Sequence, residues 1–65
     1  MQIILNGTST ETAAAHVEAL VAEVGLKRGM VLVEHNSVAL HPDEWPAVTL
    51  KEQDRLELLR IVAGG

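Results

Sequence analysis

One segment of this chain has the periodicity of an amphipathic helix, and that restricts the folds open to the sequence. In AAAHVEALVAEVG apolar residues recur at helical spacing, and Gly25 follows them as a natural C-cap. The spacing predicts a helix at about 13–24. Its start is open, because Thr12 could cap it or the three alanines could belong to a loop that ends near His16. The apolar stripe of this helix is expected to belong to the core.

The segments around this helix follow the alternation of β-strands, in which successive side chains point to opposite faces. MQIILN and TSTET flank Asn6-Gly7, a pair that tolerates the positive φ of a type I′ hairpin turn. The other apolar segments are MVLVEH, VAL and RLELLRIV. The sequence therefore predicts a hairpin over 1–12, strands over 30–35 and 38–40 with a turn at Asn36-Ser37, and a last strand over 55–62.

The stretch HPDEWPAVTLKEQD has neither period. Pro42-Asp43-Glu44 suits a single helical turn. A loop this long needs anchors in a small domain, and Trp45 is predicted to plug the end of the core beneath it. The expected element order is ββαββ, an irregular loop, then β.

Composition excludes several classes of function. The 65 residues include no cysteine, which excludes disulfides, thiolate zinc sites and thiol nucleophiles. The net charge of −4 and the single Trp argue against nucleic-acid binding, which needs a basic face and often aromatic residues. No apolar run is long enough to span a membrane, and MQIIL has no basic n-region, so a cytoplasmic protein is expected. His16, His35 and His41 match no standard ligand spacing, so we expect no metal site.

Four stretches carry a resemblance to a known family: MQIILNG, VEALVAEVGL, VLVEHNSVALHPDEW and LKEQDRLELLRIVAGG. Together they span essentially the whole chain, and LKE-x-DR followed by a strand and a terminal Gly-Gly is the most specific part. The chain resembles the ThiS family of sulfur carrier proteins of thiamine biosynthesis. The resemblance implies an α+β, ubiquitin-like β-grasp fold, with a mixed sheet of about four to five strands packed on one helix. It also implies a β-grasp domain at 1–61 and a flexible C-terminal tail at 62–65.

The chain departs from the family pattern in its turns. The family commonly has glycine where Gln53 stands, and often has a Pro-Arg pair near His41-Pro42. The segment between the hairpin and the helix is about one residue short. These departures concern turn geometry and partner choice, and they leave the tail unchanged.

The resemblance implies that the carboxylate of Gly65 is the reactive group. In the family an ATP-dependent adenylyltransferase, related to ubiquitin-activating enzymes, adenylates this carboxylate. A sulfur donor system then supplies sulfur, and the resulting thiocarboxylate serves thiazole synthase. The carrier catalyses nothing and binds no cofactor, and the ATP is used by the activating enzyme. Val62, Ala63 and Gly64 would form a thin lead into the partner's cleft, because glycine has no Cβ. A monomer is expected.

A docking patch is predicted on the outer face of the sheet. Leu59 and Ile61 alternate with core-facing residues on the last strand, and Ile4 points the same way on the first. These two strands are neighbours in β-grasp sheets, so the three side chains are expected to form an apolar patch beside the tail. The alternative is that they are ordinary exposed aliphatic residues.

Other functions are compatible with the same sequence features. A related carrier could serve molybdopterin synthesis, tRNA thiolation or another sulfurated product, although the absence of Phe favours the thiamine assignment. A ubiquitin-like modifier would use the same activation step and join Gly65 to lysines of other proteins. An interaction module with an inert tail is the third alternative.

Overall fold

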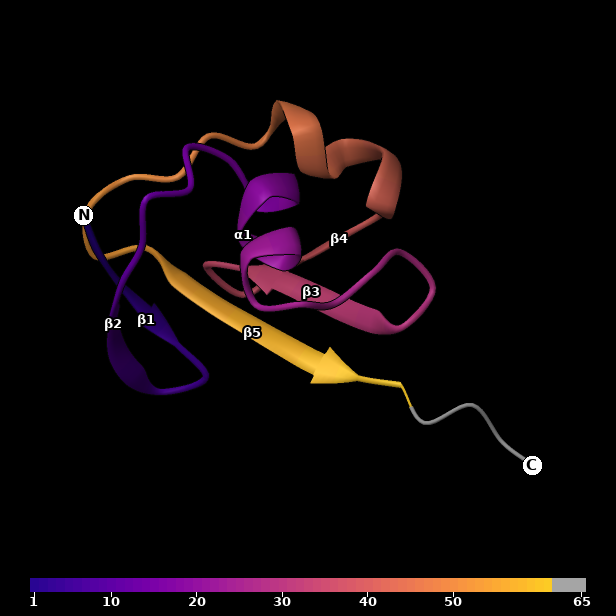
Figure 1. Cartoon of the computed structure of the whole chain (residues 1–65), viewed down its shortest axis with the longest axis horizontal. Helices are drawn as coiled ribbons and strands as arrows, with labels where there is room; N and C mark the ends of the chain where they lie inside the picture. Colours follow the sequence, from indigo (N-terminus) through magenta and orange to yellow (C-terminus); the bar gives the residue numbers. More distant parts are fainter. Residues whose placement is uncertain (62–65) are drawn as a thin grey trace.

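The computed structural model of the chain describes residues 1–61 and contains one sheet, one α-helix and one 3-10 helix (Figure 1). The predicted element order is confirmed. The last strand, expected over 55–62, ends at Arg60, and residue 62 lies outside the described part. The elements are β1 (Gln2–Leu5), β2 (Thr8–Glu11), α1 (Val17–Glu23), β3 (Val31–His35), β4 (Val38–Leu40), η1 (Pro42–Ala47) and β5 (Arg55–Arg60).

The five strands form one mixed sheet in the order β2-β1-β5-β3-β4. The central strand β5 pairs parallel with β1 and antiparallel with β3, while the two hairpins β1–β2 and β3–β4 flank it. Helix α1 lies over one face of this sheet, with η1 beside it (Figure 1). This is the predicted β-grasp arrangement, and it leaves the other face of the sheet uncovered within the described residues.

The core lies between α1 and the inner face of the sheet. Alternation places Leu56 and Leu58 of β5 on that face, as predicted, and Trp45 closes one end of the core with only 3% of its surface exposed. Burying such side chains is the main source of stability for a domain of this size. The full set of buried apolar residues is Ile3, Ala14, Val17, Leu20, Val21, Val31, Val33, Trp45, Leu50, Leu56 and Leu58.

Both predicted hairpin turns are formed with positive φ. Asn6 and Gly7 have φ of 48° and 82°, and Asn36 and Ser37 have φ of 49° and 72°. Asn6 also extends the pairing of β1 with β5, because its Oδ1 accepts from the Leu58 amide at 2.7 Å. The conformation of these turns depends mainly on the turn residues themselves, so it could be predicted from the local sequence.

The helix prediction at 13–24 is wrong at its start. Helix α1 begins at Val17, and the imidazole Nδ1 of His16 caps it by accepting from the Ala19 amide at 3.1 Å. The alternative of a loop ending near His16 is confirmed. The reason is tertiary, because the Leu50 amide donates to the Ala15 carbonyl at 2.9 Å and holds the alanine segment against the loop before β5.

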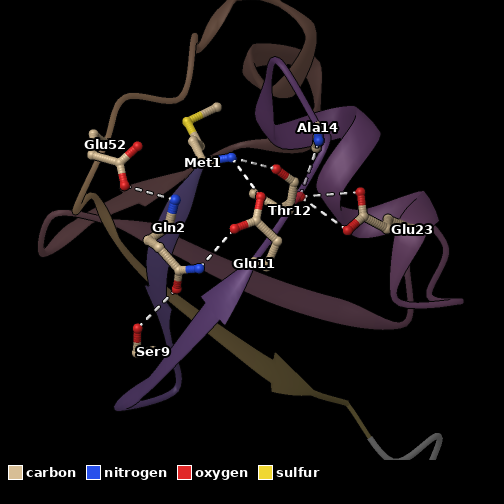
Figure 2. A network of polar contacts seen from close by, with 8 residues as sticks. All are labelled: Met1, Gln2, Ser9, Glu11, Thr12, Ala14, Glu23 and Glu52. Carbon is tan, nitrogen blue, oxygen red and sulfur yellow. Dashed lines mark hydrogen bonds and ion pairs between the residues drawn. The ribbon is translucent and has the colours of Figure 1, made fainter.

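Thr12 does not cap the helix, because its hydroxyl is used elsewhere. Thr12 is 2% exposed, and its hydroxyl oxygen lies 3.0 Å from both carboxylate oxygens of Glu23, at the far end of α1. It also accepts from the Ala14 amide at 3.0 Å. Figure 2 shows how these contacts connect the end of β2 to the helix.

The same network continues to the first strand (Figure 2). The amino group of Met1 donates to Glu11 Oε2 at 2.8 Å, and the Gln2 side-chain amide donates to Glu11 Oε1 at 2.7 Å. The hydrogen bond from the Met1 amino group holds the pKa of Glu11 below its ordinary value. Glu52 Oε2 accepts from the Gln2 amide at 2.7 Å, so the hairpin is tied to the turn that precedes β5.

The loop after β4 is more regular than predicted. Instead of a single helical turn, η1 spans six residues, Pro42–Ala47. His41 and Glu44 form a capping box, in which Glu44 Oε1 accepts from the His41 amide at 2.6 Å and His41 Nδ1 accepts from the Asp43 amide at 3.1 Å. Within residues 1–61, no helix has the length and apolar character needed to cross a membrane.

Candidate docking surface on the outer face of the sheet

The predicted reactive residue Gly65 and the lead Val62, Ala63 and Gly64 lie outside the described residues. The structure describes the chain up to Ile61, whose amide donates to the Met30 carbonyl at 2.8 Å. That bond fixes the point at which the chain leaves β5. The candidate site is therefore the surface of the sheet next to this point.

Leu59 lies on the outer face of the sheet, as its alternation with the core residues predicted. Its surface is 64% exposed, and its cross-strand partner on β3 is Leu32, which is 57% exposed. Directly opposed side chains of an antiparallel pair are close enough to touch. The outer face therefore carries an apolar rung near the end of β5, which we call the leucine rung.

A second rung of a different chemistry lies next to the leucine rung. Glu34 of β3 is paired with Glu57 of β5, and both side chains are exposed. The two rungs line a shallow depression of about 400 Å³ whose walls are Leu32, Leu59, Glu34 and Glu57. One end of the depression is thus aliphatic and the other is acidic, an arrangement suited to binding.

The other two predicted docking residues, Ile4 and Ile61, are not part of the leucine rung. Ile4 is half-buried and faces Arg55 across the parallel β1–β5 pair. Arg55 precedes Leu59 by four residues on β5. At about 3.3 Å per residue this is a separation of about 13 Å along the strand. The structure therefore separates Ile4 from Leu59, while Ile61, 42% exposed, follows β5.

Leu32 was not predicted as a docking residue from the sequence, although strand alternation indicates its position on the outer face. Val31 and Val33 are the core-facing residues of β3, so alternation alone sends Leu32 and Glu34 to the outer face. What alternation does not give is the register between β3 and β5. That register decides which residue stands beside Leu59.

The three histidines have structural contacts. His16 caps α1, His41 caps η1, and His35 Nε2 lies 2.8 Å from Asp54 Oδ2. Within residues 1–61, no three metal-binding side chains gather into a group. The histidines therefore contribute to turns and helix ends in the described structure.

A second depression, of about 250 Å³, lies between α1 and η1. Trp45 forms part of its wall, and an ion pair between Arg28 and Asp43 joins the loop after α1 to η1. The hydrogen bond from Arg28 holds the pKa of Asp43 below its ordinary value. This depression lies on the helical side of the molecule, away from the leucine rung.

Comparison with known proteins identifies relatives of the whole chain. The model of the ThiS family matches residues 3–65. A thiazole synthase from Paramagnetospirillum magneticum is 30% identical over 66 residues. The match covers 100% of this chain but 20% of that protein, so the chain spans about a fifth of the relative's length.

Two solved structures of a thiamine biosynthesis protein (ThiS) from Geobacter metallireducens have the same fold. The crystal structure superposes with a TM-score of 0.81 at 28% identity and covers 100% of both chains. The solution structure determined by NMR gives the same TM-score and identity, and covers 100% of this chain and 88% of the other.

Proposed function

The chain belongs to the ThiS family, and we propose on that basis that it is a sulfur carrier of thiamine biosynthesis. The single observation that carries the proposal is the extent of the family match, which runs through residue 65 and so includes the Gly64-Gly65 pair. The similarity to a thiamine biosynthesis protein over the full length of both chains supports it. In this proposal the chain is a co-substrate of other enzymes and is not itself an enzyme.

The proposed chemistry takes place at the carboxylate of Gly65. An α-carboxyl group has a pKa of about 3.3–3.7, so at neutral pH it is an anion and a poor electrophile. An adenylyltransferase would join it to the adenylyl group of ATP and release pyrophosphate. A sulfur nucleophile from a donor system would then displace AMP, and the thiocarboxylate would donate sulfur for thiazole formation. ATP is used by the activating enzyme, and the carrier needs no bound cofactor.

The outer face of the sheet is the proposed docking surface for these enzymes. Leu32 and Leu59 form its apolar centre, and Ile61 and Ile4 lie along the same face by strand alternation. Gly65 follows Leu59 by six residues, a span of at most about 20–22 Å when extended. A partner bound on the leucine rung therefore has the reactive end within reach of its own cleft.

Thiazole synthase is the proposed acceptor of the sulfur. A relative with this name contains, within one longer chain, a segment that matches the whole of the present protein. Joining two domains in one chain raises their effective concentration, which suits partners that meet repeatedly. We propose that the present chain meets the synthase in the cytoplasm and is a monomer.

The test is an intact-mass measurement on the purified chain. The chain is incubated with ATP, a sulfur donor and the adenylyltransferase of the same organism, and the expected result is a gain equal to sulfur replacing oxygen, localised to Gly65. A matched variant that lacks Gly65 should show no gain. An unchanged mass with an active adenylyltransferase would contradict the proposal, and an isopeptide-linked ladder in cell lysate would indicate a protein modifier instead.

A further inference from the structure

The pair of Glu34 and Glu57 on the outer face, which we call the acidic rung, is unfavourable for the stability of the isolated domain. Glu34 and Glu57 stand directly opposite each other, and like charges in that position destabilise an antiparallel pair. Within residues 1–61, the salt bridges of the structure join neither carboxylate to a basic group. Arg55 shares their face, but it precedes Glu57 on β5 and so lies on the side away from the leucine rung.

The acidic rung is also part of a shaped surface. It forms one wall of the depression of about 400 Å³ whose other wall is the leucine rung, with Leu32 57% and Leu59 64% exposed. A partner that covers the leucines must therefore cover the two carboxylates as well. Burying two unpaired carboxylates is costly, so the partner must supply positive charge at this position.

We propose that the depression binds an arginine side chain of thiazole synthase, with its guanidinium between Glu34 and Glu57 and its stem along Leu32 and Leu59. A planar guanidinium has five N–H donors, so it can donate to two carboxylates at once while its methylene groups cover aliphatic surface. The inference rests on the proposed function. The net charge of −4 adds a long-range attraction for a basic partner surface.

The choice of the synthase as the occupant rests on the relative from Paramagnetospirillum magneticum. That protein, named a thiazole synthase, contains a match to all of the present chain, so a domain of this kind occurs in one polypeptide with the rest of that protein. The paired glutamates would fix how the carrier sits on the synthase. Two charged contacts beside an apolar centre define an orientation, which apolar contact alone does not.

The experiment uses the full chain and the purified, assembled thiazole synthase of the same organism. The variants are E34Q, E57Q and the double variant E34Q/E57Q. E18Q is the matched control, because Glu18 is exposed on α1, on the opposite side of the sheet. Binding is measured by calorimetry at low and high salt, and the melting temperature of each isolated chain is recorded.

The expected result has two parts of opposite sign. The double variant should bind the synthase roughly tenfold more weakly at low salt, with a smaller difference at high salt. The same variant, tested alone, should melt about 2–4 °C higher, because the repulsion across the rung is gone. E18Q should leave the affinity unchanged. If the two glutamates only kept the surface hydrated, replacing them would not both raise the melting temperature and weaken binding.

Two outcomes would overturn the inference at different levels. An unchanged affinity of the double variant overturns the role of the acidic rung and leaves the proposed function intact. Absence of binding by the unaltered chain overturns the role of the synthase as well. The mass gain on Gly65, measured on the same preparation, then shows whether the carrier chemistry still holds.

Discussion

The imidazole Nε2 of His35 lies 2.8 Å from Oδ2 of Asp54, and this contact joins the end of β3 to the turn before β5. Asp54 accepts two further hydrogen bonds, from the Lys51 amide at 2.9 Å and from the Asn36 side-chain amide at 3.2 Å. Its carboxylate is thus the common acceptor for two turns that are distant in sequence. Because β5 is the central strand, this contact helps set where that strand begins.

Replacing Asp54 with asparagine should destabilise the domain by about 1–3 kcal/mol at neutral pH, since a buried acceptor is exchanged for a group that cannot satisfy all three donors. Burial raises the pKa of Asp54, but the hydrogen bonds from His35, Lys51 and Asn36 outweigh it and hold the pKa below 3.8. A lowered folded-state pKa stabilises the fold at pH above the unfolded value. That stabilisation is lost as the pH falls through the folded value.

The measurement is urea denaturation of the unaltered chain and of D54N between about pH 7 and about pH 2. The difference in the free energy of unfolding between the unaltered chain and D54N should have its largest value near neutral pH and should decrease below about pH 4. E18Q serves as the control, because Glu18 lies on the surface of α1 away from this cluster. A difference that stayed constant across the range would show that the ionised carboxylate is not the stabilising species.

Replacing Gln53 with glycine should stabilise the domain. Gln53 has φ of 69°, in the left-handed region that costs a residue with a Cβ about 1–2 kcal/mol. Glycine removes that strain but adds about 0.5–1 kcal/mol of unfolded-state entropy, so the net gain should be about 0.5–1 kcal/mol. The backbone is held in place, because the Gln53 amide donates to the Gln2 carbonyl at 2.7 Å.

Thermal unfolding of Q53G should show a melting temperature higher by about 2–8 °C. S37G is a second test of the same kind, because Ser37 has φ of 72° in the hairpin turn. K51G is the contrasting control, since Lys51 is not among the positive-φ residues of residues 1–61 and should be destabilised by glycine. Equal effects of Q53G and K51G would rule out conformational strain as the cause.

Local patterns were sufficient to predict most of the fold. The alternation in RLELLRIV placed Leu56 and Leu58 in the core and Leu59 outside, and the structure confirms all three. The family resemblance supplied the pairing of the first strand with the last, which the structure confirms, and positive φ at Asn6-Gly7 followed from the residue types themselves. The alternation and the turn depend on a residue and its immediate neighbours, so a single sequence contains them.

Features that depend on distant partners were not predictable in the same way. The start of α1 is set by hydrogen bonds between the alanine segment and the loop near Leu50, which override helix propensity. The neighbour of Leu59 is set by the register of β3 on β5, which pairs it with Leu32 and leaves Ile4 beside Arg55. The sequence therefore predicted the outer face but not the composition of its apolar centre.

Replacing Leu59 with arginine should weaken activation without unfolding the domain. Leu59 is 64% exposed, so the free energy of unfolding should change by no more than about 0.5 kcal/mol. The rate of mass gain at Gly65 should fall roughly tenfold, because a charged side chain replaces half of the leucine rung in the proposed docking surface.

Two variants serve as controls for L59R. V38R alters another exposed apolar residue, 60% exposed in β4, and should leave the rate unchanged. L58A alters the buried neighbour and should cost about 2–5 kcal/mol of stability. If L59R unfolded like L58A, the assignment of Leu59 to the outer face would be wrong.

The indole of Trp45 provides a last prediction about the core. Trp45 is 3% exposed, and its Nε1 is buried without a hydrogen-bond partner in the described structure. An unpaired buried donor costs about 1–3 kcal/mol, whereas the apolar ring contributes through burial. W45F should therefore change the free energy of unfolding by less than about 1 kcal/mol, because loss of the donor offsets the smaller ring. W45A should cost about 3–5 kcal/mol, which approaches the whole stability of so small a domain.

Urea denaturation followed by far-UV circular dichroism can compare these variants, since the chain contains one Trp and fluorescence is lost with it. The informative quantity is the difference between W45F and W45A. If W45F were as unstable as W45A, the prediction that loss of the unpaired donor offsets the smaller ring would be wrong. A stable W45F would instead show that Trp45 holds the loop over the core by its size and apolar surface.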